Sequence, residues 1–113
     1  MAQEDGYWQQ VYYALDWVMD AISDRQPQVV EKVTFGAVDI DPKYLAIHFL
    51  FATDREREFA QETGLSTEIA HLTREKLNQV GYPPESLREI YIGFTSQEEI
   101  QTQAGGDYRL YFQ

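Results

Sequence analysis

The chain has 113 residues, of which 43% are hydrophobic and 14% aromatic, and its formal net charge is −10 at pH 7. This length corresponds to a single globular domain, residues 1–113, and the acidic balance argues against binding nucleic acid or anionic lipid, since both favour basic surfaces. Cysteine is absent, no apolar run approaches the roughly 20 residues of a membrane span, and the N-terminus lacks the pattern of a secretory signal, so we expect a cytoplasmic protein without a membrane segment.

The first predicted element is an amphipathic helix over residues 3–24, which ends before Pro27. At about 100° per residue, its apolar stripe consists of Trp8, Val11, Leu15, Val18 and Ile22. Aromatic and acidic side chains occupy much of the rest of the surface: Tyr13, Asp16, Trp17, Asp20 and Asp24. With Glu4 and Asp5, the acids of this segment supply half of the net charge. Exposed aromatic rings among like charges suggest a surface for a basic protein partner, unless the loop after Gln61 or a second subunit covers Trp17.

A hairpin is predicted next, with strands over residues 29–39 and 44–52 joined by a turn around Pro42. The odd positions of the second strand are strongly apolar, so they should face the core: Leu45, Ile47, Phe49 and Phe51. The even positions should lie on a partly open face of the sheet: Tyr44, Ala46, His48 and Leu50.

The pair Thr53 and Glu56 resembles a capping box and predicts a short helix over residues 54–61. A longer helix is predicted over residues 66–80, because Gly81 and the following prolines end the helical pattern. A strand over residues 87–95, a polar connection over residues 96–103, a glycine turn and a last strand over residues 108–112 complete the chain.

The predicted fold is α+β, in the order α-β-β-α-β-β, with a four-stranded, largely antiparallel sheet and two main helices packed on one face. Such an arrangement leaves the other face of the sheet bare, which allows either a monomer or a homodimer. A second candidate surface therefore lies on that face and contains Tyr44, His48, Tyr91, Arg109 and Tyr111.

The sequence offers little support for catalysis or cofactor binding. Neither His48 nor His71 has a second histidine at metal-ligand spacing. Asp16, Asp20 and Asp24 form an i, i+4, i+8 ladder, but the carboxylates of a metal site usually converge from several elements. Motifs for a phosphate-binding glycine loop or a serine nucleophile are missing. We therefore expect no metal, no cofactor and no enzymatic activity.

The order of these segments resembles that of small bacterial immunity proteins, the inhibitors of contact-dependent inhibition and polymorphic toxins. The matching pieces are an N-terminal helix containing Ala14-Leu-Asp-Trp, an apolar strand ending at Asp54, Ser66-Thr-Glu at the head of a helix, Glu89-Ile-Tyr-Ile, and Asp107-Tyr-Arg-Leu-Tyr. They span about residues 10–112, and Pro83-Pro84 departs from the pattern. No binding residue is carried over from the family.

The resemblance implies a cytoplasmic immunity protein that neutralises a cognate toxin domain, often a basic nuclease, by occluding its active site or substrate groove. An acidic inhibitor would meet such a partner rapidly through electrostatic steering. The alternatives are a small-ligand-binding or accessory subunit that uses the open sheet face around His48, and a nucleic-acid mimic. The mimic fits less well, because the acids after residue 24 are interleaved with bases, as in Asp54-Arg-Glu-Arg-Glu.

Overall fold

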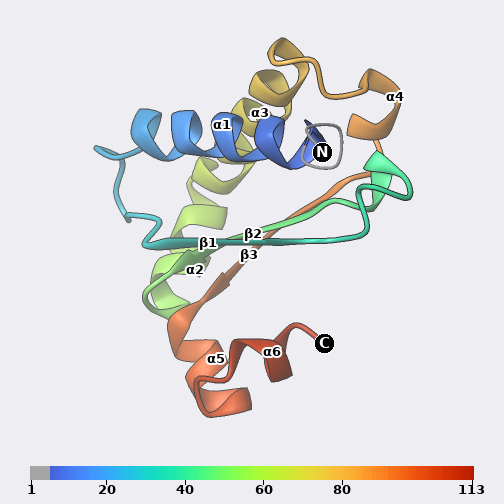
Figure 1. Ribbon diagram of the computed structural model, residues 1–113. Coiled ribbons are helices and arrows are strands. Elements are labelled where there is room, and N and C mark those ends of the chain that lie inside the picture. Colours follow the sequence, from blue (N-terminus) through green and yellow to red (C-terminus); the bar gives the residue numbers. More distant parts are fainter. Residues whose placement is uncertain (1–5) are drawn as a thin grey trace.

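Helices lie on both faces of a three-stranded sheet in the computed structural model, which describes residues 6–113 (Figure 1). In chain order the elements are α1 (Gly6–Ala21), β1 (Glu31–Phe35), η2 (Pro42–Tyr44), β2 (Ala46–Phe51), α2 (Asp54–Glu62), α3 (Leu65–Gln79), α4 (Pro84–Leu87), β3 (Tyr91–Ser96), α5 (Gln97–Ala104) and α6 (Tyr108–Tyr111). Helices α1 and α3 lie on one side of the strands, and α5 and α6 lie on the other. Glu4, Asp5 and the predicted helical turn before Gly6 fall outside the described residues.

The sheet has the order β1-β2-β3 and mixes the two strand directions. The predicted antiparallel hairpin is confirmed, with Val33 opposite His48. The four-stranded, largely antiparallel sheet is wrong, because β3 runs parallel to β2 with Gly93 beside His48. Parallel neighbours need a long crossover connection, and the segment from α2 to α4 provides it. The predicted α+β class holds.

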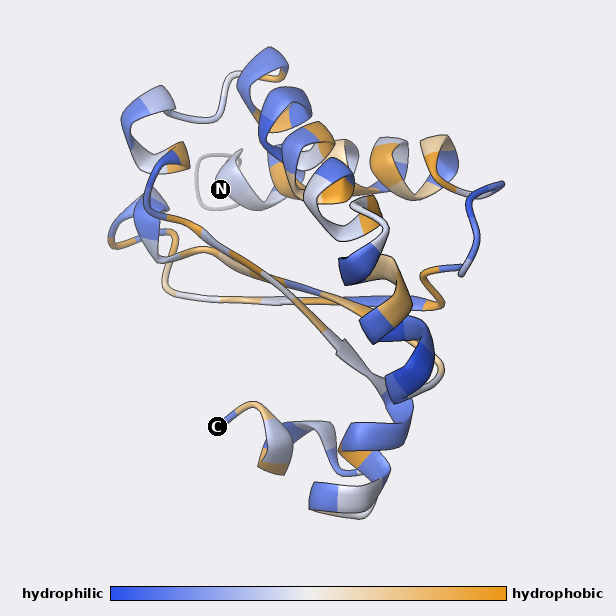
Figure 2. Cartoon of the chain, turned by 180° about the vertical axis from the view of Figure 1, so that it is seen from behind, coloured by the Kyte–Doolittle hydropathy of each residue, from blue (hydrophilic) through white to orange (hydrophobic). Residues whose placement is uncertain are grey.

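The main core lies between β2 and the helices α1 and α3. All four odd positions predicted to face the core are at most 1% exposed: Leu45, Ile47, Phe49 and Phe51. They share one hydrophobic cluster with the α1 stripe of Val11, Leu15 and Val18 and with Ile69 and Leu77 of α3. Apolar and hydrophilic positions alternate along α1 and α3 (Figure 2), and the buried positions of the two helices are mostly apolar. The 3.6-residue and two-residue periods of the sequence therefore located this core correctly.

The C-terminal segment differs most from the prediction. Residues 96–103 were expected to be a polar connection, but Ser96 caps helix α5 by accepting a hydrogen bond from the Glu99 amide at 2.9 Å. Residues 108–112 were expected to form a strand, but Asp107 caps helix α6 by accepting a hydrogen bond from the Leu110 amide at 3.1 Å. Both contacts satisfy amides that have no partner within their helix, which favours a helix over an extended chain at these positions.

Helix α6 lies on the sheet face that was predicted to be open. The Tyr108 hydroxyl donates to Glu31 Oε1 at 2.5 Å, and the Tyr111 hydroxyl lies 2.8 Å from Thr95 Oγ1. Glu31 and Thr95 are the β1 and β3 neighbours of Leu50 in β2. Leu50 is fully buried although it lies outside the main core cluster. The sheet is consequently covered on both faces at this point, in place of the single helical layer expected.

Candidate functional site

The surface of α1 that faces away from the core carries the first set of predicted site residues, which we call the α1 surface: Tyr13, Asp16, Trp17, Asp20 and Asp24. The three carboxylates are exposed, Trp17 is 43% exposed and Tyr13 is 62% exposed. Asp24 lies just after the end of the helix. The loop after Gln61 does not bury Trp17, so the two rings are available for contact together with the acids around them.

Lys76 of α3 is the neighbour that sequence reasoning missed. Its ammonium group lies 4.5 Å from the centre of the Trp17 ring and 5.7 Å from the centre of the Tyr13 ring. Both distances fall within the range of cation–π attraction. Helix packing alone brings these residues together, because α1 lies across α3 and the two helices are far apart in sequence. The rings of the α1 surface therefore already hold one cation from the chain itself.

The α1 surface is flat rather than hollow. A crevice beside Trp17, lined also by Leu72 and Lys76, has a volume of only about 20 Å³. Such a space holds about one water molecule and no larger ligand. Exposed aromatic rings on a flat surface suit contact with another protein better than enclosure of a small molecule.

The carboxylates of the α1 surface form few ion pairs with neighbouring bases among the described residues. Asp16 lies 3.8 Å from the ammonium group of Lys32, but its side chain is 78% exposed, and exposed pairs of this kind contribute little energy. Among residues 6–113, no ion pair involves Asp20 or Asp24. These two carboxylates are therefore available to a cationic partner.

The second candidate surface is partly assembled and partly covered. His48 and Tyr91 lie together, with their ring centres 5.1 Å apart. Tyr44 belongs to η2, where its ring lies near Lys43 and remains 51% exposed. Arg109 and Tyr111 are not sheet residues, because they belong to α6. The prediction that these five side chains share an open sheet face is wrong, since α6 itself rests on that face.

Phe35 and Phe112 complete an aromatic cluster around His48 that the sequence analysis did not include in the site. Their ring centres lie 5.4 Å and 4.6 Å from that of His48. The ring of Tyr91 folds back over Gly93, where a Cβ atom would lie 2.4 Å from the Tyr91 hydroxyl. The cluster thus closes the middle of this face and leaves only its rim exposed, at Tyr91 and Phe35.

Glu99 joins α5 to α2 and α6 through two strong contacts. It accepts hydrogen bonds from the Tyr111 hydroxyl and, at 2.5 Å, from the Arg57 guanidinium. The hydrogen bond from Tyr111, and to a smaller extent the one from Arg57, holds the pKa of Glu99 below its usual range. Burial, and then the bond to Glu99, raises the pKa of Tyr111. Glu99 stays ionised and Tyr111 stays protonated near neutral pH, which suits a structural role in fixing the C-terminal helices.

The described residues offer no arrangement typical of catalysis or metal binding. Within residues 6–113, no group of three or more histidine, aspartate or glutamate side chains is placed to hold a metal ion. His48 has aromatic rings as its ring neighbours, and His71 is exposed and lies 3.0 Å from Glu75 on the same helix. A general base needs a reacting group within hydrogen-bond reach, and neither histidine is held against a nucleophile in this part of the chain.

The position of His48 predicts a pH dependence of stability. Burial lowers the pKa of His48, so the unfolded chain takes up a proton more readily than the folded chain does. Stability should therefore fall as the pH drops below about 6.5, the ordinary value of the unfolded state, towards the lower folded value. We expect the His48→Phe variant to lose less stability than the wild type between about pH 7.5 and pH 5.5 in urea unfolding.

The matched control for this measurement is His71→Gln, because the His71 side chain is 72% exposed. The free energy of unfolding of His71→Gln should differ between the two pH values by as much as that of the wild type. An equal loss of stability in the wild type and in His48→Phe would contradict the assignment to His48.

Comparisons with protein-family models, with curated proteins and with solved structures find no match to this chain. Among residues 6–113, no helix is long and apolar enough to cross a membrane. The feature of the described residues with the clearest chemistry is the acidic α1 surface, with its two exposed aromatic rings.

Proposed function

We propose that the chain is a cytoplasmic immunity protein that neutralises a cognate, basic toxin domain by binding it directly through the α1 surface. The observation that carries this proposal is the exposure of Trp17 and Tyr13 beside the carboxylates of Asp20 and Asp24, which form no ion pair within residues 6–113. Protein interfaces commonly have an aromatic anchor surrounded by charged groups, and the anchor supplies most of the binding energy.

The position of Lys76 supports a cationic partner. Its ammonium group rests on the same two rings, which demonstrates that a cation can approach them within the folded chain. A lysine or arginine of the partner would pair with Asp20 or Asp24, and it would reach the rings where Lys76 turns aside, because two cations on the same rings repel one another. A cation–π contact contributes about 0.5–1 kcal/mol when exposed and about 2 kcal/mol when water is excluded, so it gains strength as the interface closes.

Inhibition in this proposal needs no chemistry by the inhibitor. The net charge of −10 attracts a basic domain and raises the association rate, which matters for a protein that must capture a toxin before it acts. Once bound, the chain would cover the active site or the substrate groove of the toxin. No nucleic acid, membrane, metal or cofactor takes part in this scheme.

The cover that α6 gives to the sheet favours this proposal over the alternative of a ligand site on the sheet face. The rings of Phe35, His48 and Phe112 pack on one another where a ligand would have to lie. Because α6 covers part of the sheet face through which a homodimer was expected to form, we propose a monomer. Tyr91, which is 55% exposed on the side of the sheet away from α1, serves as the comparison surface.

The electrostatic part of the proposal predicts a salt-dependent association rate. We expect Asp20→Lys to slow association with the cognate toxin domain of this proposal, as measured by stopped-flow fluorescence. The difference in association rate between Asp20→Lys and the wild type should shrink as the salt concentration rises from about 0.01 M to about 1 M. Over this range the screening length falls from about 30 Å to about 3 Å.

The matched control is Asp39→Lys, which alters the net charge equally in the exposed connection between β1 and β2. It should slow association less than Asp20→Lys does at low salt. Identical rates for the two variants would mean that net charge alone matters and that the α1 surface is not the contact.

A further inference from the structure

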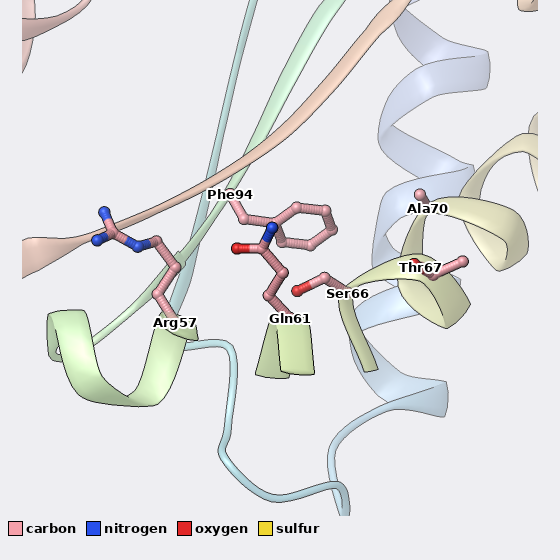
Figure 3. A pocket seen from close by; sticks show the side chains of 6 residues that line it. All are labelled: Arg57, Gln61, Ser66, Thr67, Ala70 and Phe94. Atoms are coloured by element: carbon pink, nitrogen blue, oxygen red, sulfur yellow. The ribbon is translucent and has the colours of Figure 1, made fainter. Parts of the chain in front are cut away.

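A cavity of about 420 Å³ lies between α2, the first turns of α3, and β3 (Figure 3). Its lining consists of Arg57 and Gln61 from α2, Ser66, Thr67 and Ala70 from α3, and Phe94 from β3. The Ser66 hydroxyl points toward the side chain of Gln61, and the Gln61 amide group extends toward Phe94. The volume falls within the range of sites that bind small molecules, and none of these residues belongs to the α1 surface.

The side chain of Ser66 gives the cavity an unsatisfied polar group. Ser66 is only 8% exposed, and its hydroxyl oxygen, which is itself shielded from solvent, has no hydrogen-bond partner among the described residues. A turn about the Cα–Cβ bond of Ser66 would be needed to present this hydroxyl to a molecule in the cavity. A buried hydroxyl without a partner costs about 1–3 kcal/mol, so such groups in folded proteins require an explanation. A ligand oxygen that accepts a hydrogen bond from this hydroxyl would remove the cost.

The start of α3 adds further donors at the same place. Its N-cap is Gly64, which has no side chain to accept hydrogen bonds from the first turn. Within residues 6–113, the amides of Leu65, Ser66 and Thr67 have no hydrogen-bond acceptor, whereas the Glu68 amide donates to the Gly64 carbonyl. Ser66 and Thr67 both line the cavity, so its wall includes the electropositive end of a 15-residue helix.

The charge of Arg57 does not make the cavity a site for an anion. Its guanidinium points away from Ser66 and lies 2.5 Å from Glu99, with Asp54 and Glu58 each at 3.8 Å. These carboxylates compensate the positive charge of Arg57 and would repel an anion. The cavity thus combines neutral hydrogen-bond donors with an apolar wall made by Phe94 and Ala70.

We propose that this cavity binds a small neutral molecule through a carbonyl oxygen of an amide or lactam group. The oxygen would accept hydrogen bonds from the Ser66 hydroxyl and from the first turn of α3, and the Gln61 amide would pair with the N–H group beside it. The apolar part of the ligand would lie on Phe94. This site is independent of the α1 surface and of any toxin.

The test is a titration of the ¹⁵N-labelled chain with four probes: uridine and N-acetylalaninamide as neutral carbonyl compounds, and acetate and phosphate as anions. We expect at least one neutral probe to shift the amide signals of Ser66 and Thr67 saturably at millimolar concentrations. Neither anion should do so. Saturable shifts with an anion alone, or no saturable shift with either neutral probe, would overturn the proposal.

Two variants locate the binding. Ser66→Ala should weaken the binding of the neutral probe about tenfold, as expected for loss of one buried hydrogen bond, and should fold at least as stably as the wild type because it removes an unpartnered hydroxyl. Ala70→Leu should abolish the shifts by filling the cavity. Ser86→Ala, at a buried serine in α4 outside the cavity, is the control and should bind as the wild type does. Unchanged binding by Ser66→Ala would contradict the proposed contact.

Discussion

The Leu50→Ala variant is expected to unfold with a free energy lower by about 2–5 kcal/mol, the range for truncating a fully buried leucine. Leu50 is 0% exposed although it lies on the sheet face opposite α1 and α3. Its burial comes from the C-terminal segment, since the tyrosines of α6 bond to Glu31 and Thr95 on either side of it. Urea denaturation of the variant measures this loss directly.

The control for Leu50 is Leu110→Ala, which removes the same atoms from a leucine of α6 that is 53% exposed. It should alter the free energy of unfolding by no more than about 0.5 kcal/mol. A cost below about 1 kcal/mol for Leu50→Ala would mean that α6 does not hold its place on the sheet in solution, because an exposed leucine loses little on truncation.

The Trp17→Ala variant is expected to bind the toxin domain at least about 30-fold more weakly, which corresponds to the roughly 2 kcal/mol of an interface hot spot. Most of the change should appear in the dissociation rate, because the loss of an anchor shortens the life of a formed complex. Surface plasmon resonance with the immobilised toxin domain separates the two rates.

Tyr91→Ala is the matched control, since it removes an aromatic ring that is 55% exposed, slightly more than Trp17, from the other side of the sheet. It should bind like the wild type. Trp17→Ala should also keep most of its stability, because the ring is 43% exposed and Lys76, which lies against it, is itself only partly buried. The reverse pattern, with Tyr91→Ala weakened and Trp17→Ala unaffected, would move the contact to the sheet face.

The elements whose apolar residues follow a single clear period, helical or extended, could be predicted from the sequence. The apolar stripe of α1 and the alternation along β2 each specify a buried face without help from the rest of the chain. The exposure of Trp17 follows from the same stripe, because this residue lies well outside it. The closeness of Lys76 could not be predicted, since it depends on how α3 packs against α1.

Strand direction and the C-terminal helices needed information that periodicity does not contain. Residues 52–90 are long enough to return the chain for either a parallel or an antiparallel β3, so length alone left the choice open. Residues 108–112 are rich in aromatic side chains, which favour strands, and a helix of four residues is too short to show a period. The signals that were present are the capping positions, with Ser96 followed by Glu99 and Asp107 after two glycines.

The incorrect prediction of a strand over residues 108–112 also altered the candidate site, as the aromatic cluster around His48 shows. As a strand, residues 108–112 would have extended the sheet and placed Arg109 and Tyr111 on its open face. As a helix, they fold back and bring Phe112 onto His48. The surface that the strand pattern predicted is thereby divided: His48 and Tyr111 are partly buried, whereas Tyr44, Tyr91 and Arg109 remain exposed at separate places. The α1 surface keeps its exposed residues on one element and is the better candidate for contact with a protein partner.

The most direct test of the α1 surface uses the two indole N–H signals of the ¹⁵N-labelled chain, one from Trp17 and one from Trp8. Trp8 is half-buried and stacked on Tyr12, with ring centres 5.6 Å apart, so it is an internal control on the same helix. The Trp17→Phe variant lacks the Trp17 indole, so its spectrum shows which of the two signals belongs to Trp8. On titration with the toxin domain, we predict that the Trp17 signal shifts or broadens while the Trp8 signal stays in place. A complex that forms and leaves the Trp17 signal unchanged would contradict the proposal.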